Sequence, residues 1–211
     1  MASRLFPRRT TGTKKKGAGG SLLELVTIVA VALGLALGIQ AFLVKPFRIP
    51  SESMVPTLEI GQRVLVNRVS GHFSDFSRGD ILVFKPPEGA ETNSCGVQQP
   101  ETSSCPTPTK QRSDTNFIKR VVAVGGDRIK VIGGSVYLNG RKQKESFANL
   151  SRDCDLCNLP DEITIPKGYY FMMGDNRGAS ADSREWGPVP KKWVIGQAFA
   201  TYWPPKRIGL L

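Results

Sequence analysis

The chain has 211 residues with a formal net charge of +11, and 40% of its residues are hydrophobic. This length allows one domain with a core of its own. The basic residues at the start of the chain, from Arg4 to Lys16, supply more than half of this net charge. The positive charge therefore does not indicate a nucleic-acid-binding domain, and no nucleic-acid partner is predicted.

An apolar stretch, residues 22–44, follows this basic segment. As a helix it would be about 34 Å long, against roughly 30 Å of hydrocarbon in a bilayer. Its carboxylate, Glu24, and its amide, Gln40, lie near the two ends, where the headgroups are within reach. A cleavable signal peptide is the alternative, but its apolar region has only ~7 to 15 residues. The stretch therefore predicts a retained transmembrane helix with the lipid bilayer as partner.

The charges that flank this helix are unequal, because only Lys45 and Arg48 follow it closely. The positive-inside rule then predicts a basic cytoplasmic tail at residues 1–21 and an exported domain at residues 47–211. Small residues recur at four-residue spacing in the helix, but they are abundant throughout it, so dimerisation is not favoured.

The exported domain is predicted to be mainly β, because short apolar or alternating runs are separated by turn signals. The predicted strands are residues 64–66, 81–84, 121–124, 128–132, 135–138, 169–173 and 194–202. The pairs Gly133-Gly134 and Asn139-Gly140 are preferred two-residue hairpin turns. No long helical period occurs outside the predicted span.

Residues 86–115 are rich in Pro, Ser, Thr, Gln and Asn, which predicts a long surface loop. All four cysteines lie on the predicted exported side, which fits an oxidising compartment. Of the three connectivities that four cysteines allow, proximity favours Cys95 with Cys105 and Cys154 with Cys157. A four-cysteine zinc site is the alternative, but it needs two short C-x-x-C pairs and the chain has one, so no metal or cofactor is predicted.

A serine nucleophile in this chain needs an unusual base. The single histidine, His72, lies in a polar stretch and is interpreted as solvated. A lysine serves as base only if burial or neighbouring cations lower its pKa from about 10.4. Lys119 qualifies, because apolar strand residues flank it and Arg120 adds a like charge. The alternative is that Lys119 points outward from an edge strand.

Three blocks of the sequence resemble the conserved boxes of bacterial type I signal peptidases, which are membrane-bound serine proteases with a Ser/Lys dyad. They are IPSESMVPTL at residues 49–58, the stretch from FIKR to GD at residues 117–127, and GDNRGASADSREWG at residues 174–187. A further stretch of this chain, RGDILVF at residues 78–84, resembles a fourth, structural box of the family. The blocks occur in the family's order behind an N-terminal anchor.

The resemblance implies a role for each matching residue. It makes Ser53 the nucleophile and Lys119 the general base. Ser51 matches the serine whose hydroxyl joins the Ser53 N–H in the oxyanion hole, and Ser180 matches the serine that orients the lysine amine.

Further positions carry supporting roles in the family. Asp182 and Arg184 match an ion pair behind the site, whereas Ile49 and Ile118 match residues that line shallow pockets for small side chains. The family often has a small satellite β lobe, which here would span about residues 130–170.

The implied function is removal of signal peptides from exported preproteins after an Ala-x-Ala-like motif, through an acyl-enzyme, at the bacterial inner membrane. The competing hypothesis is an anchored β-domain that binds exported proteins without catalysis. This hypothesis would be favoured if another residue replaced the family's serine, lysine or oxyanion residue, and all three are present. A self-cleaving protease of the repressor type also uses Ser and Lys, but such proteases lack a membrane anchor.

Overall fold

The computed structural model describes residues 18–150 and 154–211. Most of the basic tail predicted for residues 1–21 therefore lies outside the described residues. The chain divides into two compact units, Met1–Ala41 and Phe42–Leu211, and each is considered by itself.

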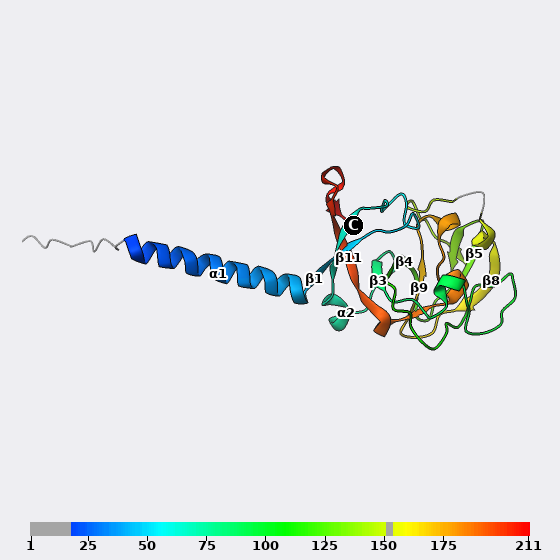
Figure 1. The fold of residues 1–211 in the computed structure, drawn as a ribbon. Helices are drawn as coiled ribbons and strands as arrows, with labels where there is room; N and C mark the ends of the chain where they lie inside the picture. Colours follow the sequence, from blue (N-terminus) through cyan, green and yellow to red (C-terminus); the bar gives the residue numbers. More distant parts are fainter. Residues whose placement is uncertain (1–17, 151–153) are drawn as a thin grey trace, which may run out of the picture. The chain divides into compact units, whose positions relative to one another are not determined.

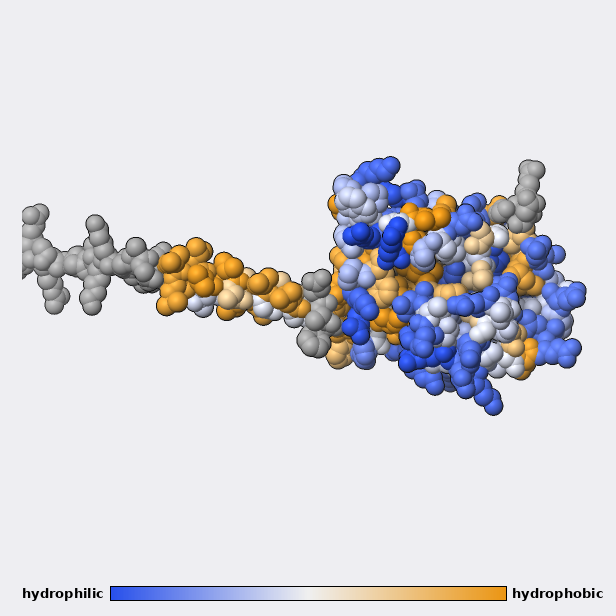
Figure 2. Space-filling model, in the orientation of Figure 1, coloured by the Kyte–Doolittle hydropathy of each residue, from blue (hydrophilic) through white to orange (hydrophobic). Residues whose placement is uncertain are grey.

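One long helix, α1 (Ala18–Phe42), belongs to the first unit except for its last residue. It begins and ends earlier than the predicted residues 22–44, and Val44 belongs instead to a strand in which it pairs with Asn67. Its leucine, isoleucine and valine side chains between residues 22 and 37 are exposed, and Figure 2 shows apolar residues along the helix. Within the described part of the chain, no helix meets the combined length and hydropathy needed to cross a membrane. The transmembrane span stays a prediction.

The second unit is mainly β, as predicted, with its strands in two antiparallel sheets (Figure 1). The larger sheet has the order β1-β2-β11-β3-β4-β9-β10, with β12 paired to β11. Its strands are β1 (Val44–Arg48), β2 (Arg63–Asn67), β3 (Ile81–Phe84), β4 (Phe117–Val124), β9 (Tyr169–Met173), β10 (Val189–Pro190), β11 (Val194–Trp203) and β12 (Gly209–Leu210).

The smaller sheet has the order β7-β6-β5-β8. Its strands are β5 (Arg128–Ile132), β6 (Ser135–Leu138), β7 (Arg141–Lys142) and β8 (Leu159–Thr164). At the β6–β7 turn, Asn139 has φ 51° and Gly140 has φ 80°, which is the left-handed geometry that such two-residue turns need.

The described helices of this unit are single turns. They are α2 (Ser70–Phe73), η1 (Ala90–Thr92), η2 (Asp155–Cys157), η3 (Arg177–Ala179), α3 (Ser183–Trp186), η4 (Lys191–Trp193) and η5 (Pro205–Arg207). The absence of a long helical period from the sequence therefore predicted the helix content of this unit correctly.

Three apolar clusters form the core. One joins the two sheets through residues such as Val122 and Phe171 on the larger sheet and Ile129 on the smaller one. A second surrounds Trp186, and a third holds Met54 against the larger sheet. Burial of these side chains contributes about 1.5–3 kcal/mol each, so the second and third clusters fix α3 and the turn after β1.

Both predicted disulfides are present, Cys95–Cys105 and Cys154–Cys157. The loop at residues 86–115 is irregular as predicted, but it is not wholly a surface loop, because Ala90 and Cys105 are buried. Ala90 packs in the cluster around Trp186.

Candidate active site

Ser53 lies in the turn that follows β1, and 5% of the residue is exposed. Met54, fully buried beside it, packs into the third core cluster, so the turn is anchored next to the serine. The Asn176 N–H donates a hydrogen bond of 3.0 Å to the Ser53 carbonyl oxygen. The Ser51 and Ser53 hydroxyl oxygens are 3.3 Å apart. The two serines of the first block are therefore adjacent, and the third block supports their backbone.

Lys119 is on β4, between β3 and β9, where it pairs with Leu82. It is 4% exposed, so the alternative of an outward-pointing lysine on an edge strand is wrong. Burial lowers the pKa of Lys119 to about 8. Asp182 opposes this change and Arg184 adds to it. At this pKa, an appreciable fraction of the amine is neutral near neutral pH.

The amine of Lys119 lies 5.8 Å from the centre of the Phe117 ring. Among the described residues it donates no hydrogen bond to Ser53 or Ser180. Hydrogen bonds between catalytic groups are often long before substrate binds. Ser180 instead donates its hydroxyl proton to Asp182 Oδ2 at 2.8 Å, which leaves the Ser180 oxygen free to accept a hydrogen bond from an amine.

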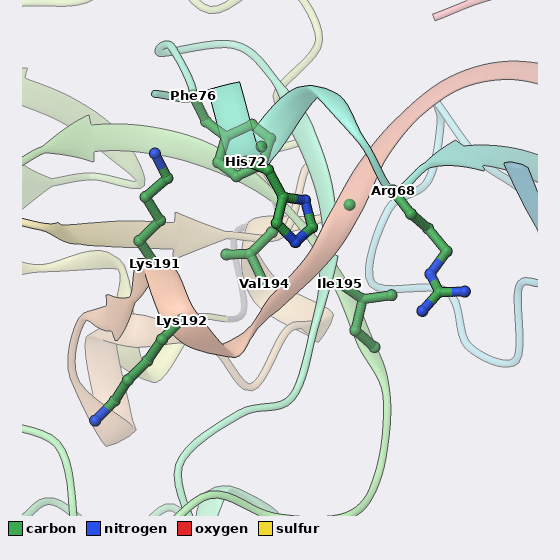
Figure 3. A pocket seen from close by; sticks show the side chains of 9 residues that line it. Arg68, His72, Phe76, Lys191, Lys192, Val194 and Ile195 are labelled. Carbon is green, nitrogen blue, oxygen red and sulfur yellow. The ribbon is translucent and has the colours of Figure 1, made fainter. Parts of the chain in front are cut away.

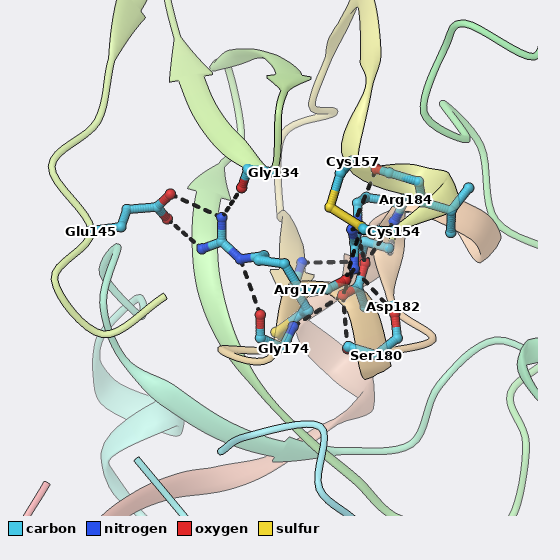
Figure 4. A network of polar contacts seen from close by, with 12 residues as sticks. Gly134, Glu145, Cys154, Cys157, Gly174, Arg177, Ser180, Asp182 and Arg184 are labelled. Atoms are coloured by element: carbon cyan, nitrogen blue, oxygen red, sulfur yellow. Dashed lines mark hydrogen bonds and ion pairs between the residues drawn. A yellow bond between two sulfur atoms is a disulfide. The ribbon is translucent and has the colours of Figure 1, made fainter. Parts of the chain in front are cut away.

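Asp182 and Arg184 form the buried ion pair that the resemblance predicts, with Nε 2.8 Å from Oδ1 (Figure 4). Both side chains are fully buried. Asp182 also accepts the Gly174 N–H at 3.0 Å. Burial alone would raise the pKa of Asp182, but the charge and hydrogen bonds of Arg184 outweigh it and lower that pKa. Asp182 thus stays ionised and holds Ser180 and Gly174 in place.

Gly174 is the point where the first and third blocks meet. A Cβ atom at this position would lie 2.4 Å from the Ser53 carbonyl oxygen and 2.3 Å from Ser180 Oγ. Real Cβ atoms essentially never approach other atoms this closely. Glycine is therefore needed here for the close approach of Ser53 to Ser180.

Gly174→Ala is expected to lower the free energy of unfolding by about 1–3 kcal/mol, because the methyl group must displace backbone and a buried hydroxyl. Urea unfolding measures the change. Gly209→Ala is the matched control, since a Cβ there meets nothing within 4 Å. Equal stability of the two variants would contradict the crowding at Gly174.

Ile49 and Ile118 line one pocket of about 240 Å³, together with Phe47 and Val83. Strand β4 presents Ile118 on the face opposite to Lys119, because side chains alternate along a strand. The two isoleucines that the resemblance selected thus line one recess, which Arg48 and Asn116 also line.

His72 lies elsewhere, on α2, where it lines a pocket of about 380 Å³ with Arg68, Phe76 and Val194 (Figure 3). None of the predicted catalytic residues lines this pocket. The structure therefore adds nothing that would favour a catalytic histidine.

The predicted influence of Arg120 on Lys119 is wrong. Arg120 forms a bidentate pair with Asp175, at 2.8 and 2.7 Å, and is not among the groups that shift the pKa of Lys119. Strand alternation, which places neighbouring side chains on opposite faces, was the available signal.

Glu185 was missed. Burial and the nearby charge of Asp182 raise the pKa of Glu185 to about 7, and its Oε2 is buried without a hydrogen-bond partner among the described residues. Its position directly after Arg184 in the third block was the only hint in the sequence.

The chain matches a family model described as signal peptidase, peptidase S26, over residues 22–203. It is 36% identical to the signal peptidase I of Leptolyngbya laminosa, over 92% of this chain and 86% of that protein. It is 38% identical to a probable signal peptidase I-1 of a Synechocystis strain, over 89% of this chain and 86% of that protein. A probable chloroplastic thylakoidal processing peptidase 2 of Arabidopsis thaliana is 36% identical over 84% of this chain and 43% of its own length. The chain belongs to the signal peptidase family, peptidase S26.

Proposed function

We propose that this protein is a membrane-anchored serine endopeptidase that removes signal peptides from exported preproteins. The observation that carries the proposal is the buried Lys119, whose pKa is lowered to about 8. A lysine in the interior has a large desolvation cost, which is expected where a neutral amine is needed as a base. Membership of the signal peptidase family supports the substrate class.

Ser53 is the nucleophile and Lys119 is the general base. The neutral amine takes the Ser53 hydroxyl proton as the oxygen attacks the scissile carbonyl, and the resulting ammonium returns that proton to the leaving amide nitrogen. The same amine then activates the water that hydrolyses the acyl-enzyme. When substrate binds and the site tightens, the Ser180 oxygen accepts a hydrogen bond from the amine and so orients it, because the Ser180 proton is already donated to Asp182.

The developing oxyanion is stabilised by the Ser51 hydroxyl and the Ser53 N–H. The 3.3 Å separation of the Ser51 and Ser53 hydroxyl oxygens supports this role, since the attacked carbonyl must lie beside Ser53. A donor in such a position contributes about 3–4 kcal/mol to transition-state stabilisation.

Specificity for small residues before the cut comes from the pocket that Ile49 and Ile118 line. Its lining combines apolar side chains with Arg48 and Asn116. Against the apolar part an alanine methyl group is accepted, whereas a charged side chain would lose its hydration there. The extended cleavage segment pairs with a strand edge, a recurring mode of peptide recognition in which main-chain hydrogen bonds hold the peptide.

The apolar helix α1 anchors the enzyme in the bacterial inner membrane as a single pass. The exposed apolar side chains of its described part support this proposal, as does the basic segment that precedes them. The N-terminus is cytoplasmic and the catalytic domain extracytoplasmic, so enzyme and signal peptide meet in the same bilayer.

Ser53→Ala tests the proposal. The full chain in detergent is expected to cleave a model preprotein after a small-x-small triplet, seen by mass spectrometry, and Ser53→Ala to lose at least about 10³-fold in rate. Ser77→Ala, which changes an exposed serine, is the control and keeps the wild-type rate. Absence of cleavage by the wild type would favour the anchored binding domain, and equal cleavage by Ser53→Ala would exclude Ser53 as the nucleophile.

A further inference from the structure

The two disulfide-bonded segments both contact Arg184, although they are far apart in the sequence. In the first, the loop at residues 86–115, Cys105 is fully buried and its N–H donates a hydrogen bond of 2.9 Å to the Arg184 carbonyl oxygen. The same loop packs tightly against the end of α3, where a Cβ at Gly187 would lie 2.9 Å from Pro108 N. The first segment therefore holds the backbone of Arg184.

The second segment holds the side chain of Arg184 (Figure 4). The Cys154–Cys157 disulfide closes the turn η2, and Arg184 Nη1 donates to the Leu156 carbonyl oxygen at 3.3 Å and lies 3.8 Å from Cys154 Sγ. Both contacts of Nη1 thus go to this turn, while Nε and Nη2 face Asp182 and Nη2 also donates to the Arg177 and Ser180 carbonyl oxygens. A guanidinium donates in a rigid planar fork, so moving the Nη1 side rotates the Asp182 side as well.

A cavity of about 270 Å³ lies between these elements and the predicted site. Asn93 of the first segment and Leu156 of the second line it, together with Ser180 and Glu185. The space beside Ser180 is therefore bounded by both disulfide-bonded segments.

We propose that the two disulfide-bonded segments are positioning elements of the active site, which act through Arg184 on Asp182 and Ser180. This inference rests on the proposed function. The Cys154–Cys157 turn has the larger effect, because it holds the guanidinium that faces Asp182, whereas Cys105 holds only a backbone carbonyl.

The charge around Lys119 predicts how the effect is observed. Lys119 is under the influence of Asp182, Glu185 and Asp175, which raise its pKa, and of Arg184, which lowers it. If Arg184 swings away when the turn is released, the depressing charge is lost and the pKa of Lys119 rises. The acid limb of the rate profile then moves to higher pH.

The test uses the full chain in detergent micelles with a peptide that spans an Ala-x-Ala cleavage site. Replacing Cys154 and Cys157 together by serine is expected to lower kcat at pH 7 about tenfold, to leave KM within twofold and to move the acid limb upward. Replacing Cys95 and Cys105 together by serine is the matched comparison and has a smaller effect in the same direction. Thermal unfolding identifies any loss that comes from unfolding alone.

A dithiol reductant provides a second test on the unmutated chain. Thiol–disulfide exchange converts Cys154–Cys157 to two thiols while the reductant becomes a cyclic disulfide, so two electrons are transferred and no other reactant is needed. Reduction is expected to lower kcat of the wild type as the Cys154 and Cys157 replacement does. The variant in which serine replaces Cys154 and Cys157 should lose much less of its kcat when the same reductant is added.

A double-mutant cycle with Arg184→Lys decides whether the effect passes through Arg184. Lysine keeps the charge but lacks the fork, so adding the Cys154 and Cys157 replacement to Arg184→Lys should cost less than twofold further in kcat. Unchanged kcat and pH profile in the disulfide variants would overturn the inference, as would additive effects in the cycle or losses that follow thermal unfolding alone. Inactive wild-type protein would instead overturn the proposed function.

Discussion

Lys119→Ala is expected to lower the rate of preprotein cleavage by about 10³-fold or more, because it removes the group that we propose accepts the Ser53 proton. The environment of Lys119 supports this size of effect, since no other amine shares its burial next to Asp182 in the described part of the chain. Cleavage of a model preprotein, followed by mass spectrometry, measures it. Lys142→Ala, which changes an exposed lysine on β7, is the control with wild-type rate.

The pH dependence of the wild type gives an independent measurement. The proposed base, Lys119, works as the neutral amine, and burial lowers its pKa to about 8, so kcat/KM should fall about tenfold per pH unit below that value. The pH dependence of kcat/KM reports the pKa of the base in the free enzyme. A rate that is flat between pH 6 and pH 9 would exclude Lys119 as the base.

The same pKa predicts how Lys119 affects stability. Between pH 8 and 10.5 the unfolded chain binds a proton at Lys119 that the folded protein has lost, so stability rises with pH in that window. Below pH 8 both states are protonated, and burying the charge costs about 3 kcal/mol. Lys119→Met, which keeps much of the volume, is therefore expected to be inactive and yet more stable than the wild type at pH 7 in urea unfolding. A less stable Lys119→Met would contradict this.

The buried strands of the larger sheet were predictable because each gives a short apolar run. Residues 81–84 and 169–173 match β3 and β9, and the hairpin of β5 and β6 follows from Gly133-Gly134. A strand buried on both faces requires apolar side chains throughout, and such a run is visible in the sequence without any knowledge of its partners.

Strands β1 and β8 were missed because both lie at sheet edges. Pro46 and Pro160 remove a backbone N–H, and charged residues accompany them, which only an edge strand tolerates. Val44 was assigned to the end of the apolar helix because it continues the apolar run. Its pairing with Asn67 depends on a residue far along the chain, so local pattern could not show it.

The candidate site was predicted residue by residue only through resemblance to the family. Composition and spacing singled out Lys119, but its burial and the neighbours that set its pKa depend on β4 lying between β3 and β9. The contact of Cys105 with Arg184 had no sequence signal, since it joins a polar loop to a buried turn. Long-range hydrogen bonds of this kind follow from the fold and not from local pattern.

Asp182→Ala is expected to lower the free energy of unfolding by about 3–5 kcal/mol, because it leaves the Arg184 guanidinium fully buried without a counterion. The Gly174 N–H and the Ser180 hydroxyl lose their acceptor at the same time. Urea unfolding measures the loss, and Asp182→Asn, which keeps an acceptor oxygen but not the charge, should fall between wild type and Asp182→Ala.

A second replacement separates the charge from the packing. The pair Asp182→Ala and Arg184→Ala in one chain should be less destabilised than the sum of the two single variants, because no unpaired buried charge remains. Asp182→Asn should also move the acid limb of the rate profile to lower pH, since Asp182 raises the pKa of Lys119. Additive losses in unfolding together with an unmoved acid limb would show that Asp182 acts on neither Arg184 nor Lys119.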